Sequence, residues 1–243
     1  MRKLGLIAAT AAASIGVTSF AQAIEVNQGL SVGIKGGKGT KAKPRNLVLS
    51  VTTTTDAIER DKNGTFATTN AVIHFDKNLR FNNARFPTCA LKIVATKPEK
   101  CPKGSQVGTG LAKATVGEGQ IKVNPSIKAY NDKNNKINLA LIAKPGEVDS
   151  SGILVGKLKK DSGKDFGFKL DVPIPAKLQE QLGLKITLTK FNTTINRNTV
   201  TVKGKKYAYV NSIGCPKGGK YKFAGDFRYS DATKESVKTT AKC

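Results

Sequence analysis

The sequence predicts an all-β protein: one antiparallel, sandwich-like domain with two disulfides and at most one short helix. Turn-forming residues recur roughly every ten residues, with β-branched runs between them, which is typical of sandwiches. Helical periodicity is nearly absent. The chain has 39% hydrophobic and 24% charged residues, a balance that indicates a folded globular domain rather than a disordered chain.

The start of the chain has the features of a secretion signal. Arg2 and Lys3 precede an uncharged stretch at 4–17, and Ala21, Gln22 and Ala23 fit a cleavage site. We therefore expect residues 1–23 to be a cleaved signal peptide and the protein to be secreted. No second long apolar run follows, so no transmembrane segment is expected. Residues 24–243 are interpreted as a single domain, with 147–152 as the place for any subdivision.

Strands are predicted wherever apolar and polar residues alternate between turn signals. The stretch 69–75 shows this best, because Ala71, Ile73 and Phe75 share one face while Val72 and His74 share the other. The expected strands are 24–34, 47–54, 69–75, 108–116, 126–130, 137–143, 153–158, 165–172, 184–191, 206–211, 221–229 and 235–240.

Turns and a single helix complete the predicted elements. Residues 132–135 and 230–233 have the composition of hairpin turns, and Pro145 and Gly146 of a third turn. The one predicted helix, 175–182, opens with Pro175 at a first-turn position and stops at Gly183.

The four cysteines are read as disulfides because their number is even in a chain expected to be exported. Four cysteines allow three connectivities. We favour Cys89 with Cys101 and Cys215 with Cys243, each bridge restricting the unfolded chain by roughly 3 kcal/mol. The alternative is a zinc site, which is disfavoured because the spacings contain no C-x2-C pair and the single His74 is distant in sequence.

Short motifs surround these cysteines: P-x-C at 87–89, C-P-x-G-S-x-V-G-x-G at 101–110, C-P-x-G-G at 215–219 and the closing Cys243. In this combination the chain resembles a family of uncharacterised secreted proteins of actinobacteria, over most of its length after residue 23. The resemblance implies an exported β fold with the pairs Cys89–Cys101 and Cys215–Cys243 in separate modules. It implies no activity.

Little in the sequence indicates catalysis. The glycine run 104–110 precedes an alternating stretch rather than a helix, so it predicts a turn feeding a strand and not a phosphate loop. His74 lies two residues before Asp76, a pair that could hold an imidazole tautomer, but no G-x-S-x-G elbow accompanies it. We nominate no catalytic residue, no metal ligand and no cofactor.

Charge is the strongest functional signal. The chain has 41 Lys and Arg against 17 Asp and Glu, a formal net charge of +24. Such a surface attracts polyanions over roughly 8–10 Å. Most of the cations are Lys, which lacks the bidentate fork of Arg, so sequence-specific recognition of nucleic acid is not expected. The basic residues form four sets: Lys35, Lys38, Lys41, Lys43 and Arg45; Lys157, Lys159 and Lys160, followed by Lys164; Lys203, Lys205 and Lys206; and Lys217, Lys220 and Lys222.

Three functional hypotheses follow, and the oligomeric state stays open in all of them. The preferred one is a non-catalytic protein of the cell envelope that associates with anionic wall polymers, or another polyanion, through its basic surface. The second is a carbohydrate- or protein-binding module with a specific pocket. The third is a hydrolase that brings His74 and an acid, or two acids, into one cleft. The alternative is that the charge has no binding role and serves only solubility and the protection of strand edges.

Overall fold

The computed structural model describes residues 26–57, 67–117, 121–181 and 183–243, so the expected signal peptide lies outside the described residues. The fold is mostly antiparallel β, with 60% strand, 7% helix and no helix of seven or more residues. The predicted fold class is therefore confirmed. None of the helices that the described residues form has the length and apolar character needed to cross a membrane.

The strands follow one another along the chain with few interruptions. Their bounds are β1 Val26–Gly36, β2 Arg45–Ala57, β3 Thr68–Asp76, β4 Leu79–Phe81, β5 Gln106–Val116, β6 Ile121–Val123, β7 Ser126–Asp132, β8 Lys136–Ile142, β9 Gly152–Lys160, β10 Phe166–Pro173, β11 Glu180–Gln181, β12 Leu184–Ile195, β13 Thr199–Val202, β14 Lys205–Ala208, β15 Val210–Ser212, β16 Lys220–Tyr229 and β17 Lys234–Lys242.

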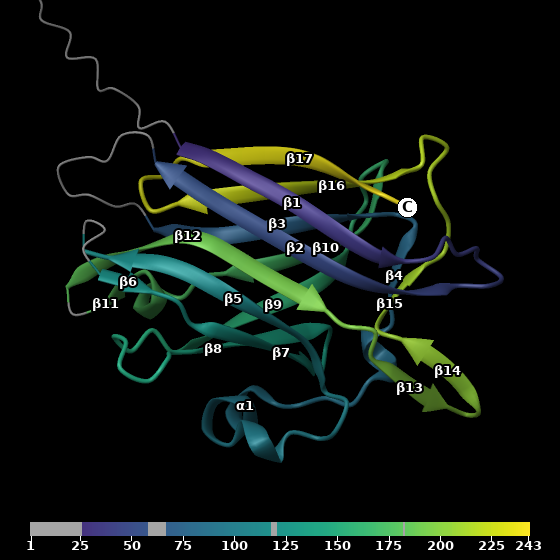
Figure 1. Ribbon diagram of the computed structural model, residues 1–243, viewed down its shortest axis with the longest axis horizontal. Helices are drawn as coiled ribbons and strands as arrows, with labels where there is room; N and C mark the ends of the chain where they lie inside the picture. The colour runs from purple at the N-terminus through teal and green to yellow at the C-terminus, as the bar shows by residue number, and fades with distance from the viewer. Residues whose placement is uncertain (1–25, 58–66, 118–120, 182) are drawn as a thin grey trace, which may run out of the picture.

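One large sheet contains fifteen of these strands, in the order β17-β16-β3-β10-β9-β8-β7-β5-β12-β2-β15-β4, with β1 on β2, β6 on β5 and β11 on β12. The sheet curls, so that β1, β2, β12 and β5 form one layer and β3, β10, β9 and β8 the other (Figure 1). Its two ends meet where β1 lies beside β17, although no strand ladder between these two is found among the described residues. The sandwich-like layers are thus two parts of a single sheet.

Alternating side chains of the two layers build the core between them. Strand β16 buries Tyr221, Phe223 and Phe227 and exposes Lys222 and Asp226 between them. Strand β3 does the same with Ile73 and Phe75, as the alternation at 69–75 predicts. The ring of Phe75 meets that of Phe81 edge-on, with centroids 4.9 Å apart.

The predicted helix at 175–182 is wrong. This segment forms one 3-10 turn, η3 (Ala176–Leu178), and then the short strand β11. The eight residues of the predicted helix, 175–182, are too few to offset helix nucleation, and Leu178 instead packs over Gly152. The α-helix that the described residues form is α1 (Leu91–Thr96), which no sequence pattern predicted. Two further 3-10 turns are η1 (Asn83–Arg85) and η2 (Pro98–Lys100).

Both favoured disulfides are confirmed. Cys89 is bonded to Cys101 and Cys215 to Cys243, with Cα atoms 5.3 and 6.0 Å apart. The first bridge encloses α1, whose Val94 packs with Cys89 in a small core of its own. The second joins the segment after β15 to the residue after β17. The predicted hairpin turns at 132–135 and 230–233 also form, between β7 and β8 and between β16 and β17.

Candidate functional site

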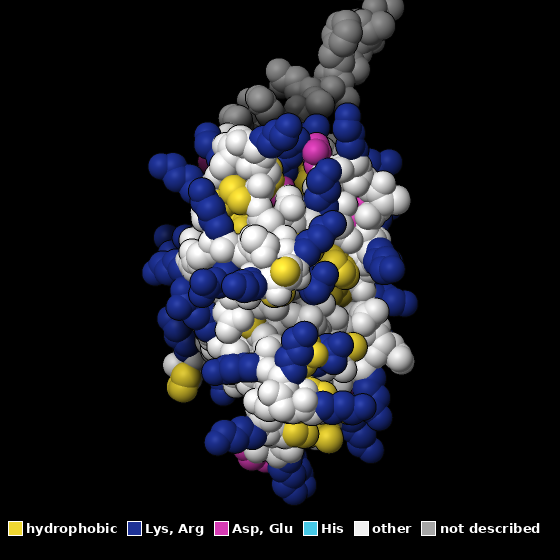
Figure 2. All heavy atoms as spheres, turned by 90° about the vertical axis from the view of Figure 1, so that its right-hand side faces the viewer, with side chains coloured by type: hydrophobic (Ala, Val, Ile, Leu, Met, Phe, Trp, Pro, Cys, Tyr) yellow, Lys and Arg dark blue, Asp and Glu magenta, His cyan; other side chains and the backbone are white. Residues whose placement is uncertain are grey.

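The four basic sets lie at one end of the molecule, the right-hand end in Figure 1, which we call the basic end. It consists of the loops 37–44, 161–165 and 213–219, the hairpin of β13 and β14, and the strand ends that adjoin them. Figure 2 looks onto this end and shows Lys and Arg side chains over most of it, with few acidic ones. The fourteen nominated cations are all exposed: Lys35, Lys38, Lys41, Lys43, Arg45, Lys157, Lys159, Lys160, Lys203, Lys205, Lys206, Lys217, Lys220 and Lys222.

Backbone contacts fix the first set beside the third and fourth. The backbone N–H of Gly39 donates to the Ser212 hydroxyl over 3.1 Å, and β15 pairs with the first residues of β2 at Arg45. Ser212 also shares a 2.6 Å hydrogen bond with the hydroxyl of Tyr221 on β16. The loop 37–44, β15 and the start of β16 are therefore held together, and the third set lies on the hairpin that precedes β15 in the chain.

The second set reaches the same end through β10. Lys160 is paired with Phe168 on β10, and Phe166 at the start of that strand is paired with Asp76 on β3. The Lys222 Nζ lies 2.9 Å from Asp165 Oδ2, a direct link from the fourth set to the loop after β9.

Few carboxylates neutralise these cations. Lys159 pairs with Asp171 over 2.7 Å, and Lys222 pairs with Asp165; the other nominated cations form no ion pair with a described residue. Hydrogen bonds from Asn70 and from Lys159 hold the pKa of Asp171 below its ordinary value. Asp76, the buried acid at this end, instead accepts from the backbone N–H of Asn78 and of Lys222.

Several lysines even lie directly opposite one another on neighbouring strands. The aligned pairs are Lys136 with Lys157, Lys159 with Lys169, and Lys220 with Lys242. Like charges in such positions destabilise a sheet. The basic end is thus charged beyond what its own carboxylates balance.

The structure adds cations that the sequence analysis missed, since they stand alone in the sequence or beside acids. One of them, Arg85, places its guanidinium 4.1 Å from the centre of the Tyr207 ring. The aromatic residues near the basic runs mostly fill the core, since Tyr209, Tyr221 and Phe223 are buried. The added exposed cations of the basic end are Lys77, Arg80, Arg85, Lys133 and Lys136.

The opposite end, at the left of Figure 1, is balanced in charge. We call it the open end, and it comprises the loops 143–151 and 230–233 and the segment 174–181, with the adjoining strand ends. Its described acids are Asp56, Glu147, Asp149, Glu180, Asp231 and Glu235, and its described cations are Lys122, Lys144, Lys177, Lys185, Arg228 and Lys234.

His74 does not pair with Asp76. Its Nδ1 lies 2.5 Å from Asp161 Oδ2 and its Nε2 lies 3.0 Å from Asp226 Oδ2, on the outer side of the sheet. Burial acts to raise the pKa of Asp161, but hydrogen bonds from His74 and from the Gly163 N–H outweigh it and leave this pKa below its ordinary value. Both ring nitrogens of His74 are engaged by carboxylates. No set of three His, Cys, Asp or Glu side chains among the described residues is placed to hold a metal ion.

The glycine run 104–110 is a turn that leads into a strand, as predicted. Gly104 occupies the turn with φ of 86°, and Gly108 and Gly110 lie on β5. A Cβ atom on Gly110 would come within 1.9 Å of the Asn192 carbonyl oxygen on β12. Because they lack a Cβ atom, the two strand glycines allow the backbones of β5 and β12 to lie close together.

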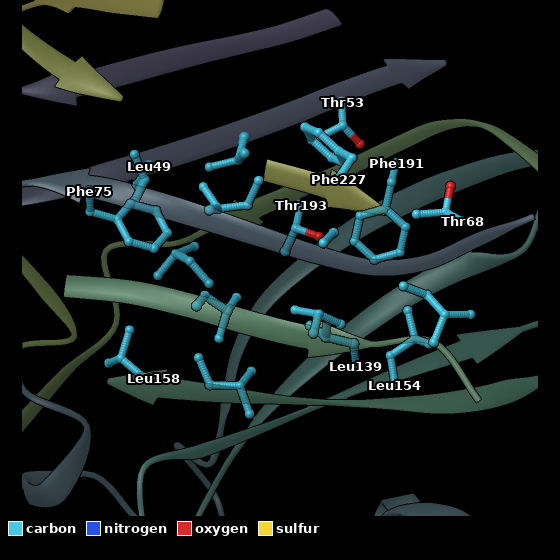
Figure 3. A pocket seen from close by; sticks show the side chains of 18 of the residues that line it. Leu49, Thr53, Thr68, Phe75, Leu139, Leu154, Leu158, Phe191, Thr193 and Phe227 are labelled. Carbon is cyan, nitrogen blue, oxygen red and sulfur yellow. The ribbon is translucent and has the colours of Figure 1, made fainter. Parts of the chain in front are cut away.

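Between the two layers lies an apolar cavity of about 110 Å³. Side chains from both layers point into it (Figure 3), among them Leu49, Phe75, Leu139 and Phe227. Every lining side chain is apolar except for those of threonines and one tyrosine. The hydroxyl of Thr193 is buried there without a hydrogen-bond partner.

A second cavity of about 140 Å³ adjoins the first toward the open end. The exposed residues Asp149, Ser151 and Lys177 belong to its lining, so it reaches the surface. The two cavities share Thr68, Leu154, Ile174, Leu188 and Phe191. The sequence predicts a specific pocket only as one of three functional hypotheses, and no motif indicates where this cavity lies.

No family model, curated protein or solved structure matches the chain.

Proposed function

We propose that this protein is an exported, non-catalytic protein of the cell envelope that holds an anionic polymer against its basic end. The observation that carries the proposal is the gathering of four basic sets, far apart in sequence, on one end of the fold with only two ion pairs among their members. A surface used for solubility alone has no need of this concentration.

The like-charge pairs strengthen the argument. Lys136 opposite Lys157 and Lys220 opposite Lys242 cost stability in the free protein. A bound polyanion removes that repulsion, so binding and stability are coupled. Protection of sheet edges does not explain the first pair, because β8 and β9 lie inside the sheet.

The chemistry of the cations favours a repeating anion without a defined sequence. Lysine is a hydrated point charge on a flexible stem, suited to successive phosphates or carboxylates rather than to base edges. Teichoic and teichuronic acids of a cell wall have this repeating charge. The two disulfides are consistent with an oxidising compartment outside the cell, as is the signal sequence.

The test measures binding of the oxidised protein, without residues 1–23, to purified cell-wall fragments before and after extraction of their anionic polymers, across a salt series. We expect binding only to unextracted fragments, with log K falling linearly against log salt. The slope counts the contacts made.

A matched pair of triple variants locates the contact. K203Q, K205Q and K206Q together remove three charges from the basic end, and K122Q, K185Q and K234Q remove three from the rest of the surface. We expect the first to lower the salt slope by about three and the affinity by at least about tenfold, and the second to do neither. Equal effects of both triples would show that net charge alone acts, and binding that ignores salt and extraction would contradict the proposal.

A further inference from the structure

We propose that the interior of the curled sheet binds one aliphatic chain of about ten carbons, with a carboxylate head at the open end. This site is separate from the basic end and does not depend on the function proposed for it.

The inner cavity offers what an alkyl chain needs. No charged side chain lines it, and the residues around it come from both layers, including Leu49 of β2, Phe75 of β3, Leu139 of β8 and Leu158 of β9 (Figure 3). Moving an alkyl group from water into such surroundings is favourable by about 0.8 kcal/mol per methylene.

The site is closed at one end and accessible at the other. Toward the basic end, Phe75, Phe81 and Tyr209 line the inner cavity and form its floor, all three buried. Toward the open end, the inner cavity adjoins the outer one, whose rim is exposed. A chain therefore enters from the open end and stops at the aromatic floor.

Size sets the chain length. The two cavities measure about 110 and 140 Å³. An engineered apolar cavity of about 150 Å³ holds one benzene, so the two cavities together have the volume for about ten carbons, and a continuous chain requires the side chains that they share to move aside. A fully packed core of this size would leave neither space open.

The outer cavity has a polar edge that suits a carboxylate. Ser150 has a buried hydroxyl without a hydrogen-bond partner, and Lys177 brings an ammonium group to the same rim. Asp149, also on this rim, accepts from the Ser151 backbone N–H over 2.9 Å, a bond that lowers its pKa and keeps it charged. Asp149 therefore repels a carboxylate head, and Lys177, the cation among the lining residues, is the group that has to offset it.

The test titrates ¹³C-labelled decanoate into the oxidised protein at high salt, which suppresses association with the basic end. We expect saturable chemical-shift changes of the label and a melting temperature that rises with decanoate concentration. Affinity increases from hexanoate to decanoate and stops increasing at longer chains, because the aromatic floor limits the depth. No saturable binding, or affinity that continues to rise through tetradecanoate, would overturn the proposal.

Two neighbouring threonines on β2 provide the matched variants. Thr53 lines the inner cavity and Thr54, the next residue, is exposed. We expect T53L to weaken decanoate binding about tenfold or more by filling the cavity, and T54L to leave it unchanged. Equal effects would place the ligand elsewhere. If T53L folds poorly, A114L, which fills the outer cavity, is measured in its place and is expected to weaken decanoate binding by the same factor.

The head group is tested with decanol as a neutral partner of decanoate. K177Q is expected to weaken decanoate binding severalfold and to leave decanol binding unchanged. A loss that is equal for both ligands, or no loss for decanoate, would overturn the assignment of the carboxylate to this rim.

Discussion

The two ends of the same sheet differ in both charge and packing. The basic end carries clustered, mostly unpaired cations and is closed by aromatic rings, whereas the open end has acids and cations in similar number around a cavity. The strands that run between them are shared. The loops and strand ends, rather than the sheet itself, therefore set the two ends apart.

The basic end, where the cavity is closed, is held together by a buried side-chain amide. Asn131, fully buried, donates from its side chain to the carbonyl oxygens of Asn83 and Pro87 over 3.0 and 3.1 Å, and its Oδ1 accepts from the Tyr209 hydroxyl over 3.1 Å. These contacts fix the segment before Cys89 against β7. The open end also has a buried amide, Gln28, which donates to the Gly29 carbonyl oxygen over 3.0 Å and accepts from the Tyr229 hydroxyl over 2.6 Å, but small residues such as Ala112 and Ala114 line the cavity there.

The largest effect expected in the comparison is on stability at the closed end. N131A removes a donor shared by several buried carbonyl groups and leaves the Tyr209 hydroxyl unpaired, at a cost of about 3 kcal/mol. N70A removes one half-buried amide contact, to Asp171, toward the open end and should cost about 1 kcal/mol. Urea unfolding of both variants gives the two values. Equal costs would mean that the closed end is no more tightly specified than the open one.

A buried tyrosine near each end allows a second comparison, at high pH. Burial raises the pKa of Tyr209 and of Tyr229 above the ordinary phenol value. A raised folded pKa gives stability that is complete below the unfolded value of about 10 and is lost as pH rises through the folded value. We expect the protein to lose stability above pH 10, by up to about 1.4 kcal/mol for each buried tyrosine at pH 11.

Phenol absorbance and unfolding measured together check this. Y209F and Y229F should each flatten the pH dependence above pH 10 while costing stability at pH 7, since Tyr209 donates to Asn131 and Tyr229 to Gln28. Tyrosine ionisation that precedes unfolding at both sites would show that neither ring is sealed from solvent.

The smallest expected effect concerns charge at the basic end. K242E places a carboxylate opposite Lys220 and should raise stability by about 0.5 kcal/mol through the new cross-strand pair. The same change should weaken polyanion binding. Thermal unfolding and the wall-fragment assay, applied to one variant, test the trade between stability and binding. A variant that is neither more stable nor weaker in binding would remove the like-charge argument.

Local features of this fold could be predicted from the sequence. The alternation at 69–75 gave the faces of β3 correctly, and the cysteine pairs and two hairpin turns are confirmed. The helix at 175–182 was wrong, since Pro and Gly bounded a segment too short to nucleate. The helix α1 was missed because it depends on packing of Val94 and on the Cys89–Cys101 bridge rather than on its own propensity.

The relation between the two ends could not be predicted. In an antiparallel sheet, the end at which a loop lies depends on how many strands precede it. Short strands such as β4, β6 and β15 have too few residues to show an alternation of apolar and polar side chains. When such strands are missed, the number of strands before a given loop is wrong, and so is the end to which the loop is assigned. The cavity was hidden for a related reason, since the threonines at 52–55 alternate between inside and outside without a change of residue type.

The contact between β1 and β17 is the place where we expect the curled sheet to open locally. Because these strands lie side by side without a ladder among the described residues, their facing amides are expected to exchange with deuterium before those of β5 or β12, which are paired on both sides. The Cys215–Cys243 bridge clasps one end of this seam, next to the start of β16. The separation of β1 from β17 is then expected to be greatest at the open end of the molecule, away from this bridge.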